Sequence, residues 1–143
     1  MCTFLLGDNM DKYMEIAIKE AKKALKSDDV PVGAVVVENN KIIAKAHNTK
    51  QKKKQTTRHA EINVIEKACK KKKNWYLSDC EIYVTLEPCD MCLNAIKQAH
   101  IKKIYYAAKR EKNVSRETSY YFQKEYQQQS SELLKKFFET KRK

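Results

Sequence analysis

The spacing of hydrophobic and polar positions predicts helices and strands in alternation along this chain of 143 residues. Residues 10–27 place apolar and small side chains on one helical face and lysines on the other, which predicts an amphipathic helix. The unbroken apolar run at 32–37 predicts a strand buried on both faces, and residues 42–46 predict its hairpin partner. The polar and basic residues 48–58 predict a loop.

The second half of the chain repeats this alternation. We expect a second helix from about His59, a strand at 81–86, a third helix at 90–99, a strand at 104–108 and a last helix from about Glu117. Strands that alternate with crossover helices build a mixed sheet with helices on both faces. The sequence therefore predicts an α/β fold, a three-layer α/β/α sandwich with a mixed sheet of four to five strands.

The length of the chain fits one domain. We interpret residues 10–143 as that single domain and residues 1–9 as a loose N-terminal tail, with Met10 as an alternative start. No apolar run approaches the roughly 18–20 residues that span a membrane, and the residues before Gly7 lack the basic lead of a signal peptide. The protein is therefore expected in the cytoplasm, with no membrane partner.

The formal net charge of +12 favours polyanionic partners, nucleic acid first among them. Lysine vastly outnumbers arginine, however, so a compositional bias explains the charge equally well, and both interpretations stay open. The five cysteines form an odd count, which argues against a fully paired disulfide framework. Two of them form a C-x-x-C pair, which in a reducing compartment indicates a metal or redox site.

Two short segments carry the candidate chemistry, and each opens a predicted helix. The first is His59-Ala60-Glu61, and the second is the P-C-x-x-C that ends at Cys92. Cys89 and Cys92 are spaced i, i+3, so they share one helical face, and a helix N-terminus favours their thiolate form. With the imidazole of His59 they make a three-ligand set. Such a set leaves the fourth zinc position to water, as catalytic rather than structural sites do.

Glu61 is the candidate proton carrier of this site. Zinc lowers the pKa of a water molecule, and a nearby carboxylate can take the proton, pass it to a ring nitrogen of the substrate and then protonate the leaving amine. A structural zinc site and a redox pair are the alternatives. The joint H-x-E and P-C-x-x-C pattern is the known signature of zinc-dependent base deaminases, and it favours the catalytic interpretation.

Over these motifs and beyond them, the chain resembles the cytidine deaminase superfamily, and within it the bacterial tRNA-specific adenosine deaminases. The resemblance is good from about Met10 to Ala108. The matching segments are Val30-Pro31-Val32-Gly33-Ala34-Val35, Asn48, His59-Ala60-Glu61-Ile62, Thr85-Leu86-Glu87-Pro88-Cys89-Asp90-Met91-Cys92, and Phe137-Phe138 with the basic residues that follow it.

The resemblance implies the cofactor, the proton carrier and the partners of the site. It implies a cytidine deaminase-like fold with one zinc ion per subunit, held by His59, Cys89 and Cys92. Glu61 is then the catalytic proton shuttle. The family also acts as a homodimer on tRNA, so both partners are expected here.

The resemblance also implies how the substrate base is held. Asn48 is expected to hydrogen-bond the base, and the backbone N–H of Ala60 is expected to help fix it. Val30 and Leu86 are expected to line the pocket. Ordinary core packing explains Val30 and Leu86 nearly as well, and a turn position is the alternative for Asn48.

After the fourth strand the sequence departs from this family. The tRNA enzymes usually carry Asp where this chain has Arg110, and the glycines that they show nearby are absent. The stretch before the last helix is also shorter, so a fifth strand is expected to be missing or irregular. In the family this region helps hold the RNA. The departures therefore concern the substrate more than the zinc chemistry.

Three functions are compatible with the sequence. The first is a zinc-dependent hydrolytic deaminase that converts adenosine to inosine in a tRNA anticodon loop, with the base flipped into the pocket. The second is a deaminase of a free base or nucleoside, of guanine or cytosine type, which the departure at Arg110 favours. The third is a non-catalytic RNA-binding subunit with a residual zinc site, and the presence of Glu61 argues against it.

Overall fold

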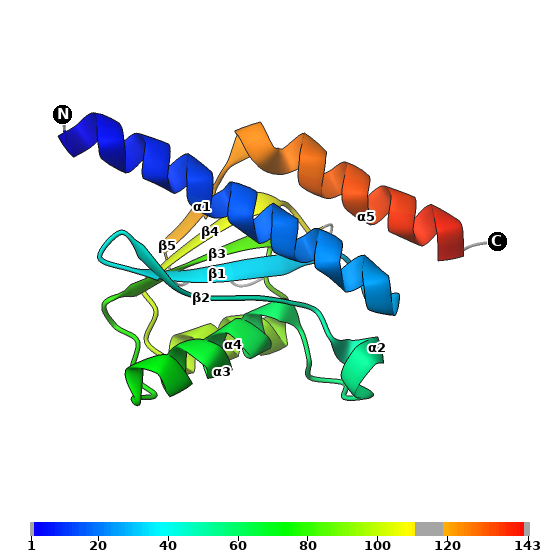
Figure 1. Cartoon of the computed structure of the whole chain (residues 1–143), viewed down its shortest axis with the longest axis horizontal. Helices are drawn as coiled ribbons and strands as arrows, with labels where there is room; N and C mark the ends of the chain where they lie inside the picture. Colours follow the sequence, from blue (N-terminus) through cyan, green and yellow to red (C-terminus); the bar gives the residue numbers. More distant parts are fainter. Residues whose placement is uncertain (1, 111–118, 142–143) are drawn as a thin grey trace.

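One five-stranded sheet lies between two layers of helices in the computed structural model, which describes residues 2–110 and 119–141 (Figure 1). The helices are α1 (Cys2–Ala24), α2 (Lys50–Lys53), α3 (Ala60–Lys72), α4 (Asp90–Gln98) and α5 (Gln127–Lys141), with 3-10 turns η1 (Leu25–Ser27) and η2 (Lys124–Tyr126). α1 and α5 cover one face of the sheet, and α3 and α4 cover the other. The predicted α/β sandwich is therefore confirmed. Within the described ranges, no helix combines the length and apolar character that crossing a membrane requires.

The sheet contains both antiparallel and parallel pairs. The strands are β1 (Gly33–Glu38), β2 (Lys41–His47), β3 (Cys80–Leu86), β4 (Lys103–Ala108) and β5 (Ser119–Phe122). They lie in the order β2-β1-β3-β4-β5. β1 pairs antiparallel with β2 and with β3, whereas β3, β4 and β5 run parallel. α4 connects β3 to β4, because parallel neighbours need a crossover rather than a tight turn.

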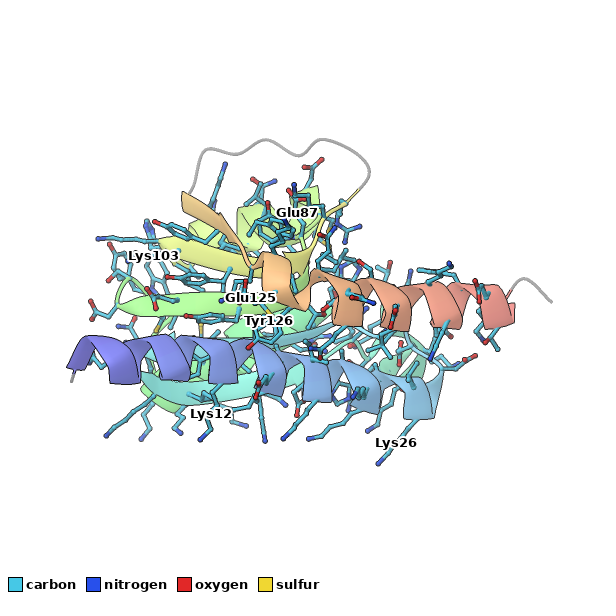
Figure 2. All side chains as sticks on the ribbon, turned by 90° about the horizontal axis from the view of Figure 1, so that it is seen from above. Lys12, Lys26, Glu87, Lys103, Glu125 and Tyr126 are labelled. Atoms are coloured by element: carbon cyan, nitrogen blue, oxygen red, sulfur yellow. The ribbon has the colours of Figure 1, made fainter. Side chains whose placement is uncertain are left out.

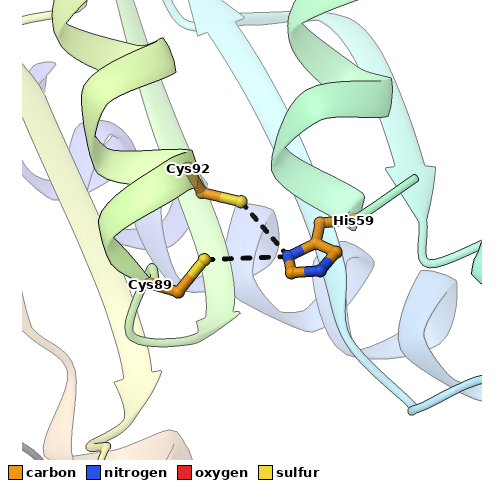
Figure 3. Close-up of side chains that lie close together, drawn as sticks. All are labelled: His59, Cys89 and Cys92. Carbon is orange, nitrogen blue, oxygen red and sulfur yellow. Dashed lines mark hydrogen bonds between the residues drawn. The ribbon is translucent and has the colours of Figure 1, made fainter. Parts of the chain in front are cut away.

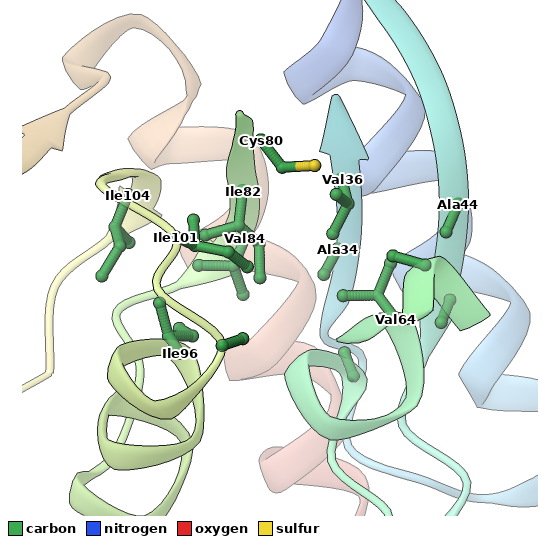
Figure 4. Packing of buried hydrophobic residues seen from close by; sticks show 14 of the residues in the cluster. Ala34, Val36, Ala44, Val64, Cys80, Ile82, Val84, Ile96, Ile101 and Ile104 are labelled. Atoms are coloured by element: carbon green, nitrogen blue, oxygen red, sulfur yellow. The ribbon is translucent and has the colours of Figure 1, made fainter. Parts of the chain in front are cut away.

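Both faces of the sheet are packed, which explains the unbroken apolar run in β1. Ala34 and Val36 belong to the cluster on the α3 and α4 side, where Val64 of α3 also packs (Figure 4). Val35 and Val37 belong to a second cluster on the α1 side. Because successive residues of a strand face opposite sides, a strand that is buried twice needs apolar residues at every position.

α1 is amphipathic as predicted, but it is longer than expected. Lys12 and, in η1, Lys26 point away from the sheet (Figure 2). The helix begins at Cys2, so it includes residues for which the sequence predicted a loose tail. It ends at Ala24, where η1 takes over. The assignment of residues 10–143 to a single domain stays a prediction.

The predicted loop at 48–58 contains a short helix, α2. The buried Asp29 carboxylate accepts hydrogen bonds from the backbone N–H groups of Gln51 at 2.5 Å and Lys52 at 3.3 Å. A carboxylate at a helix start satisfies N–H groups that have no partner inside the helix. Since Asp29 lies far outside the segment, its local pattern of polar residues could not reveal this helix.

The last helix begins later than predicted, and the fifth strand is present. The sequence placed the helix start near Glu117, but Ser119–Phe122 pairs in parallel with β4, and α5 begins only after η2. Aromatic residues suit a strand, and the ring of Tyr121 stacks on that of Tyr105 in β4, with centroids 5.0 Å apart. Residues 111–118, where most of the departure from the family falls, lie outside the described residues.

Gly33 allows α1 to lie directly against the start of β1. A Cβ atom at this position would overlap the carbonyl oxygen of Ala17 and lie 2.5 Å from the backbone nitrogen of Ala21. We expect Gly33→Ala to lower the free energy of unfolding by about 1–3 kcal/mol or more, because overpacking forces the backbone to shift. Urea denaturation measures this change. Adding Ala17→Gly should not restore stability, since the clash involves a backbone oxygen. A Gly33→Ala midpoint equal to that of the wild type would contradict this packing.

Candidate metal and catalytic site

The two candidate motifs meet at one end of the sheet. α3 precedes β3 in the chain and runs in the opposite direction along the sheet. The N-terminus of α3 therefore lies near the carboxyl end of β3, where α4 begins. His59 is the N-cap residue of α3 (φ −74°, ψ 156°), and Cys89 is the N-cap residue of α4 (φ −73°, ψ 173°). Cys92 lies in the first turn of α4. The fold therefore brings His59 next to a pair of cysteines that lies about thirty residues further along the sequence.

Figure 3 shows these three side chains facing one another. The Nδ1 atom of His59 lies 3.8 Å from the sulfur of Cys89 and 3.4 Å from that of Cys92. All three candidate ligand atoms lie within 4.8 Å of one another, and no fourth His, Cys, Asp or Glu of the described residues joins the group. Two sulfurs and an imidazole are donors that zinc prefers, and three protein ligands leave one position open. The cluster fits a catalytic metal ion better than a structural one.

Hydrogen bonds within the cluster determine where its protons lie. Those from Cys92 and His59 lower the pKa of Cys89 to about 3. The bond to Cys89, together with burial, raises the pKa of Cys92, and the bond to Cys89 also raises the pKa of His59. The cluster by itself thus favours a thiolate at Cys89 and a proton on Cys92. Metal ligands bind in their deprotonated forms, so an incoming metal ion must displace protons.

Glu61 lies in the first turn of α3, and it is only 2% exposed. Burial raises the pKa of its carboxyl group, although a backbone hydrogen bond and the positive charges of His59 and Arg110 act in the opposite direction. A raised pKa makes the carboxylate a stronger proton acceptor, which suits general acid–base catalysis. The role of Glu61 as proton carrier stays a prediction.

A cavity of about 940 Å³ adjoins the cluster. The predicted site residues that line it are Val30, Asn48, His59, Glu61, Leu86 and Cys89. Cys92 and Ala60 are fully buried and do not line it. The structure thus places the candidate pocket residues Val30, Asn48 and Leu86 around the same space as the candidate ligands. Their contacts with a substrate stay predictions.

The backbone N–H of Ala60 has a protein partner in this structure. It donates a 2.6 Å hydrogen bond to Oδ1 of Asn48, whereas the sequence interpretation directs it to the substrate base. This bond holds the amide group of Asn48 in one orientation. The Nδ2 group of Asn48 is then the available donor of a residue that lines the cavity. A contact between Ala60 and the base stays a prediction.

The wall opposite the motifs comes from α5. Leu134, Phe137 and Phe138 line the cavity, and an ion pair between Lys141 and Asp28 connects α5 to the end of η1. The resemblance marked Phe137 and Phe138 as part of a closing helix without assigning them a place in the site. Only the apolar face of the last helix could have indicated this wall. Arg110, which the sequence marked as a departure, also lines the cavity.

An α/β/α sandwich with a His-Cys-Cys cluster beside a buried glutamate is the arrangement of a hydrolytic deaminase. The chain belongs to the MafB19-like deaminase family, whose model matches residues 8–142. This family membership confirms the class of enzyme that the two motifs predicted.

The proteins similar to this chain include enzymes named tRNA-specific adenosine deaminase. The one from Agrobacterium fabrum is 37% identical over 143 residues, covering 91% of this chain and 94% of that protein. Those from Aquifex aeolicus and Bacillus subtilis are 44% and 47% identical over 96 residues, or 67% of this chain. The match spans only 64% and 60% of the lengths of these two proteins.

Two solved structures resemble the fold closely. One comes from a study of A-to-I editing by tRNA:A34 deaminases at the wobble position, with a TM-score of 0.81 and 35% identity. The match covers 87% of this chain and 99% of the chain in that structure. The other is guanine deaminase from Bacillus subtilis, with a TM-score of 0.66 and 37% identity, covering 69% of this chain and 64% of its own. Both names describe deaminases, but the substrates in the two names differ.

The cluster predicts that zinc affinity rises with pH. Below the raised pKa of Cys92 its thiol keeps its proton, so each proton that zinc displaces costs about tenfold in affinity per pH unit of acidification. Competition with a chromophoric chelator at pH 6 and pH 8 measures this dependence. Cys92→Ser should weaken binding more than about 100-fold. Cys69→Ser is the matched control, because Cys69 lies outside the cluster. Equal losses in both variants, or an affinity that ignores pH, would argue against this metal site.

Proposed function

We propose that this chain is a zinc-dependent hydrolytic deaminase that converts adenosine to inosine in a tRNA anticodon loop. The main observation behind the proposal is the cluster of His59, Cys89 and Cys92, which adjoins the same cavity that the buried Glu61 lines. The relatives named tRNA-specific adenosine deaminase support the substrate. A tRNA substrate, a cytoplasmic location and a homodimer are parts of this proposal.

His59, Cys89 and Cys92 would hold the zinc ion in this mechanism. When bound, zinc would lower the pKa of a water molecule, so that a nucleophile is available near neutral pH. Glu61 takes a proton from the attacking water and delivers it to the ring nitrogen of the base, while the water oxygen bonds to the neighbouring carbon that carries the amino group. The same carboxyl group then takes the second proton, from the newly added hydroxyl group, and passes it to the amine; the C–N bond breaks, the carbonyl forms and ammonia leaves. The raised pKa of Glu61 supports this role, because it makes the carboxylate a stronger proton acceptor.

The cavity supports a flipped base with its neighbours nearby. Its volume of about 940 Å³ exceeds what a single nucleobase needs. Asn48 offers a hydrogen-bond donor to the base, and Val30 and Leu86 offer apolar contacts at the same cavity. Enzymes that act on a base within RNA take it out of the stack into a pocket of this kind.

A free base or nucleoside is the second candidate substrate. The Bacillus subtilis guanine deaminase shares the fold at 37% identity, and the same metal and proton chemistry serves either substrate. The stretch after Ala108, which departs from that of the resembled tRNA enzymes, is the sequence feature that favours this candidate. The choice therefore needs a direct assay.

We expect the zinc-loaded protein to release ammonia from an anticodon stem-loop that carries adenosine at its first anticodon position, and to leave inosine there. Guanine, cytosine, adenosine and cytidine are assayed separately at the same concentration. Ammonia assays and nucleoside chromatography of the digested RNA provide the two measurements. Ammonia release from a free base or nucleoside, with none from the stem-loop, would contradict the tRNA proposal and favour a free base or nucleoside deaminase.

Glu61→Gln should reduce kcat by about 10²–10⁴-fold while zinc content stays at one per chain, because a positioned proton carrier contributes that range. Glu66→Gln on the same helix is the matched control, since Glu66 is exposed and pairs with Arg58 instead. Metal analysis accompanies each rate. If Glu61→Gln kept the wild-type rate, Glu61 would not be the proton carrier. If the wild type itself were inactive on every substrate but bound RNA, the chain would be a non-catalytic subunit.

A further inference from the structure

Arg110 occupies the cavity without belonging to the metal cluster or to the proton path. It follows the end of β4, it is half-buried, and it lines the same space as His59 and Glu61. Its positive charge acts on both of these residues and opposes the overall rise in their pKa values. The guanidinium therefore lies close to where the proposed substrate binds.

Two hydrogen bonds to Glu87 hold Arg110 in place. The side-chain Nε of Arg110 donates to the backbone carbonyl oxygen of Glu87 at 2.6 Å, and the backbone N–H of Arg110 donates to its carboxylate at 3.2 Å. Glu87 is fully buried, and its own N–H donates to Ala108 at 2.8 Å. The inner part of the guanidinium is thus fixed to the sheet. A guanidinium held through Nε still has the four N–H groups of its two outer nitrogens.

Arg110 forms no ion pair with a carboxylate among the side chains that the structure describes, those of residues 12–110 and 121–141. Among the acids that line the cavity, Glu61 is affected by the charge of Arg110 without forming an ion pair with it. The other three acids have different surroundings. Asp28 pairs with Lys141, and Asp29 accepts the N–H groups at the start of α2. Asp90 is exposed in the first turn of α4. A fixed, half-buried positive charge in a substrate cavity is therefore available to an anionic ligand.

We propose that Arg110, with Lys109 beside it, is an anion subsite that binds a phosphate group next to the target base. Arginine presents N–H groups in a planar fork that matches phosphate oxygens, which makes it a preferred phosphate ligand. Lys109 also lines the cavity, and its Nζ lies 4.5 Å from the centroid of the Phe122 ring. This subsite rests on the proposed function and narrows its substrate class to phosphorylated nucleotides rather than free bases.

The phosphate can come from two sources, the backbone of an RNA strand or a free nucleotide. Both present the same oxygens to Arg110, and they differ in what lies beyond the phosphate. The experiment therefore uses an anticodon stem-loop and, in a second arm, adenosine 5′-monophosphate against adenosine. The protein is the zinc-loaded full chain with Glu61→Ala added, so that binding is measured without turnover.

Salt dependence separates a phosphate contact from a merely structural role. Each phosphate contact with a single strand adds about 0.7 to the slope of log affinity against log salt. Arg110→Ala should flatten this slope by about 0.7 and weaken stem-loop binding by about tenfold or more at low salt. Arg110→Lys should keep the slope, because the charge remains, but lose part of the affinity with the fork. Lys102→Ala is the control, since Lys102 is exposed and does not line the cavity.

The outcomes distinguish this subsite from the proposed function. The subsite is overturned if the salt slope is unchanged in Arg110→Ala, or if Arg110→Lys behaves like Arg110→Ala. It is also overturned if the protein with an intact Arg110 binds neither the stem-loop nor the monophosphate. If the wild type forms inosine in the stem-loop while the slope is unchanged, only the subsite fails. If it forms none, but Arg110→Ala removes a preference for the monophosphate over adenosine, the subsite stands and the tRNA proposal fails. A loss confined to the stem-loop identifies backbone phosphate as the source.

Discussion

At its carboxyl end, just before the cysteines of the site, the chain of β3 is hydrogen-bonded on both sides. The hydroxyl oxygen of Thr85 accepts the N–H of Gly33 at 3.1 Å, and the N–H of Glu87 donates to the carbonyl of Ala108 at 2.8 Å. These bonds determine where the strand stops and where the chain turns into the helix that begins after Cys89. A slip of one residue would turn every side chain of the strand to the other face. The two thiols would then no longer face the imidazole, so the metal cluster depends on this register.

The same placement creates the electrostatics of the site through competing effects. Burying the carboxyl group of Glu61 disfavours its charged form, and the nearby positive charges of His59 and Arg110 partly offset that cost. Burial is the larger effect, so the pKa of Glu61 is raised overall. At the cluster, Cys89 and Cys92 divide their protons unequally because one accepts the hydrogen bond that the other donates. The N-termini of α3 and α4 lie close together, and this proximity underlies both the metal cluster and the electrostatics of Glu61.

The parts of this structure that could be predicted are those whose causes lie within a short segment. The apolar run of β1 reports burial on both faces, and the i, i+3 spacing of Cys89 and Cys92 reports a shared helical face. The parts that could not be predicted depend on distant partners. α2 is capped by Asp29 from before β1, β5 exists because it pairs with β4, and the α5 wall is fastened through Asp28. No periodicity in these segments records a partner so far away in the sequence.

Glu87 connects the part of the site that was predicted with the part that was not. It stands two residues before Cys89 in the turn out of β3, and it also holds Arg110 through both its carbonyl and its carboxylate. The charge at position 110 acts on Glu61 as well as on a substrate. An acidic side chain there would repel the Glu61 carboxylate and raise its pKa further, whereas Arg110 lowers it. Exchanging Asp for Arg at this position therefore changes the charge preferred in a substrate and the proton affinity of the catalytic carboxyl together. The residue at position 110 thus acts on substrate charge and on Glu61 without changing the residues of the metal cluster.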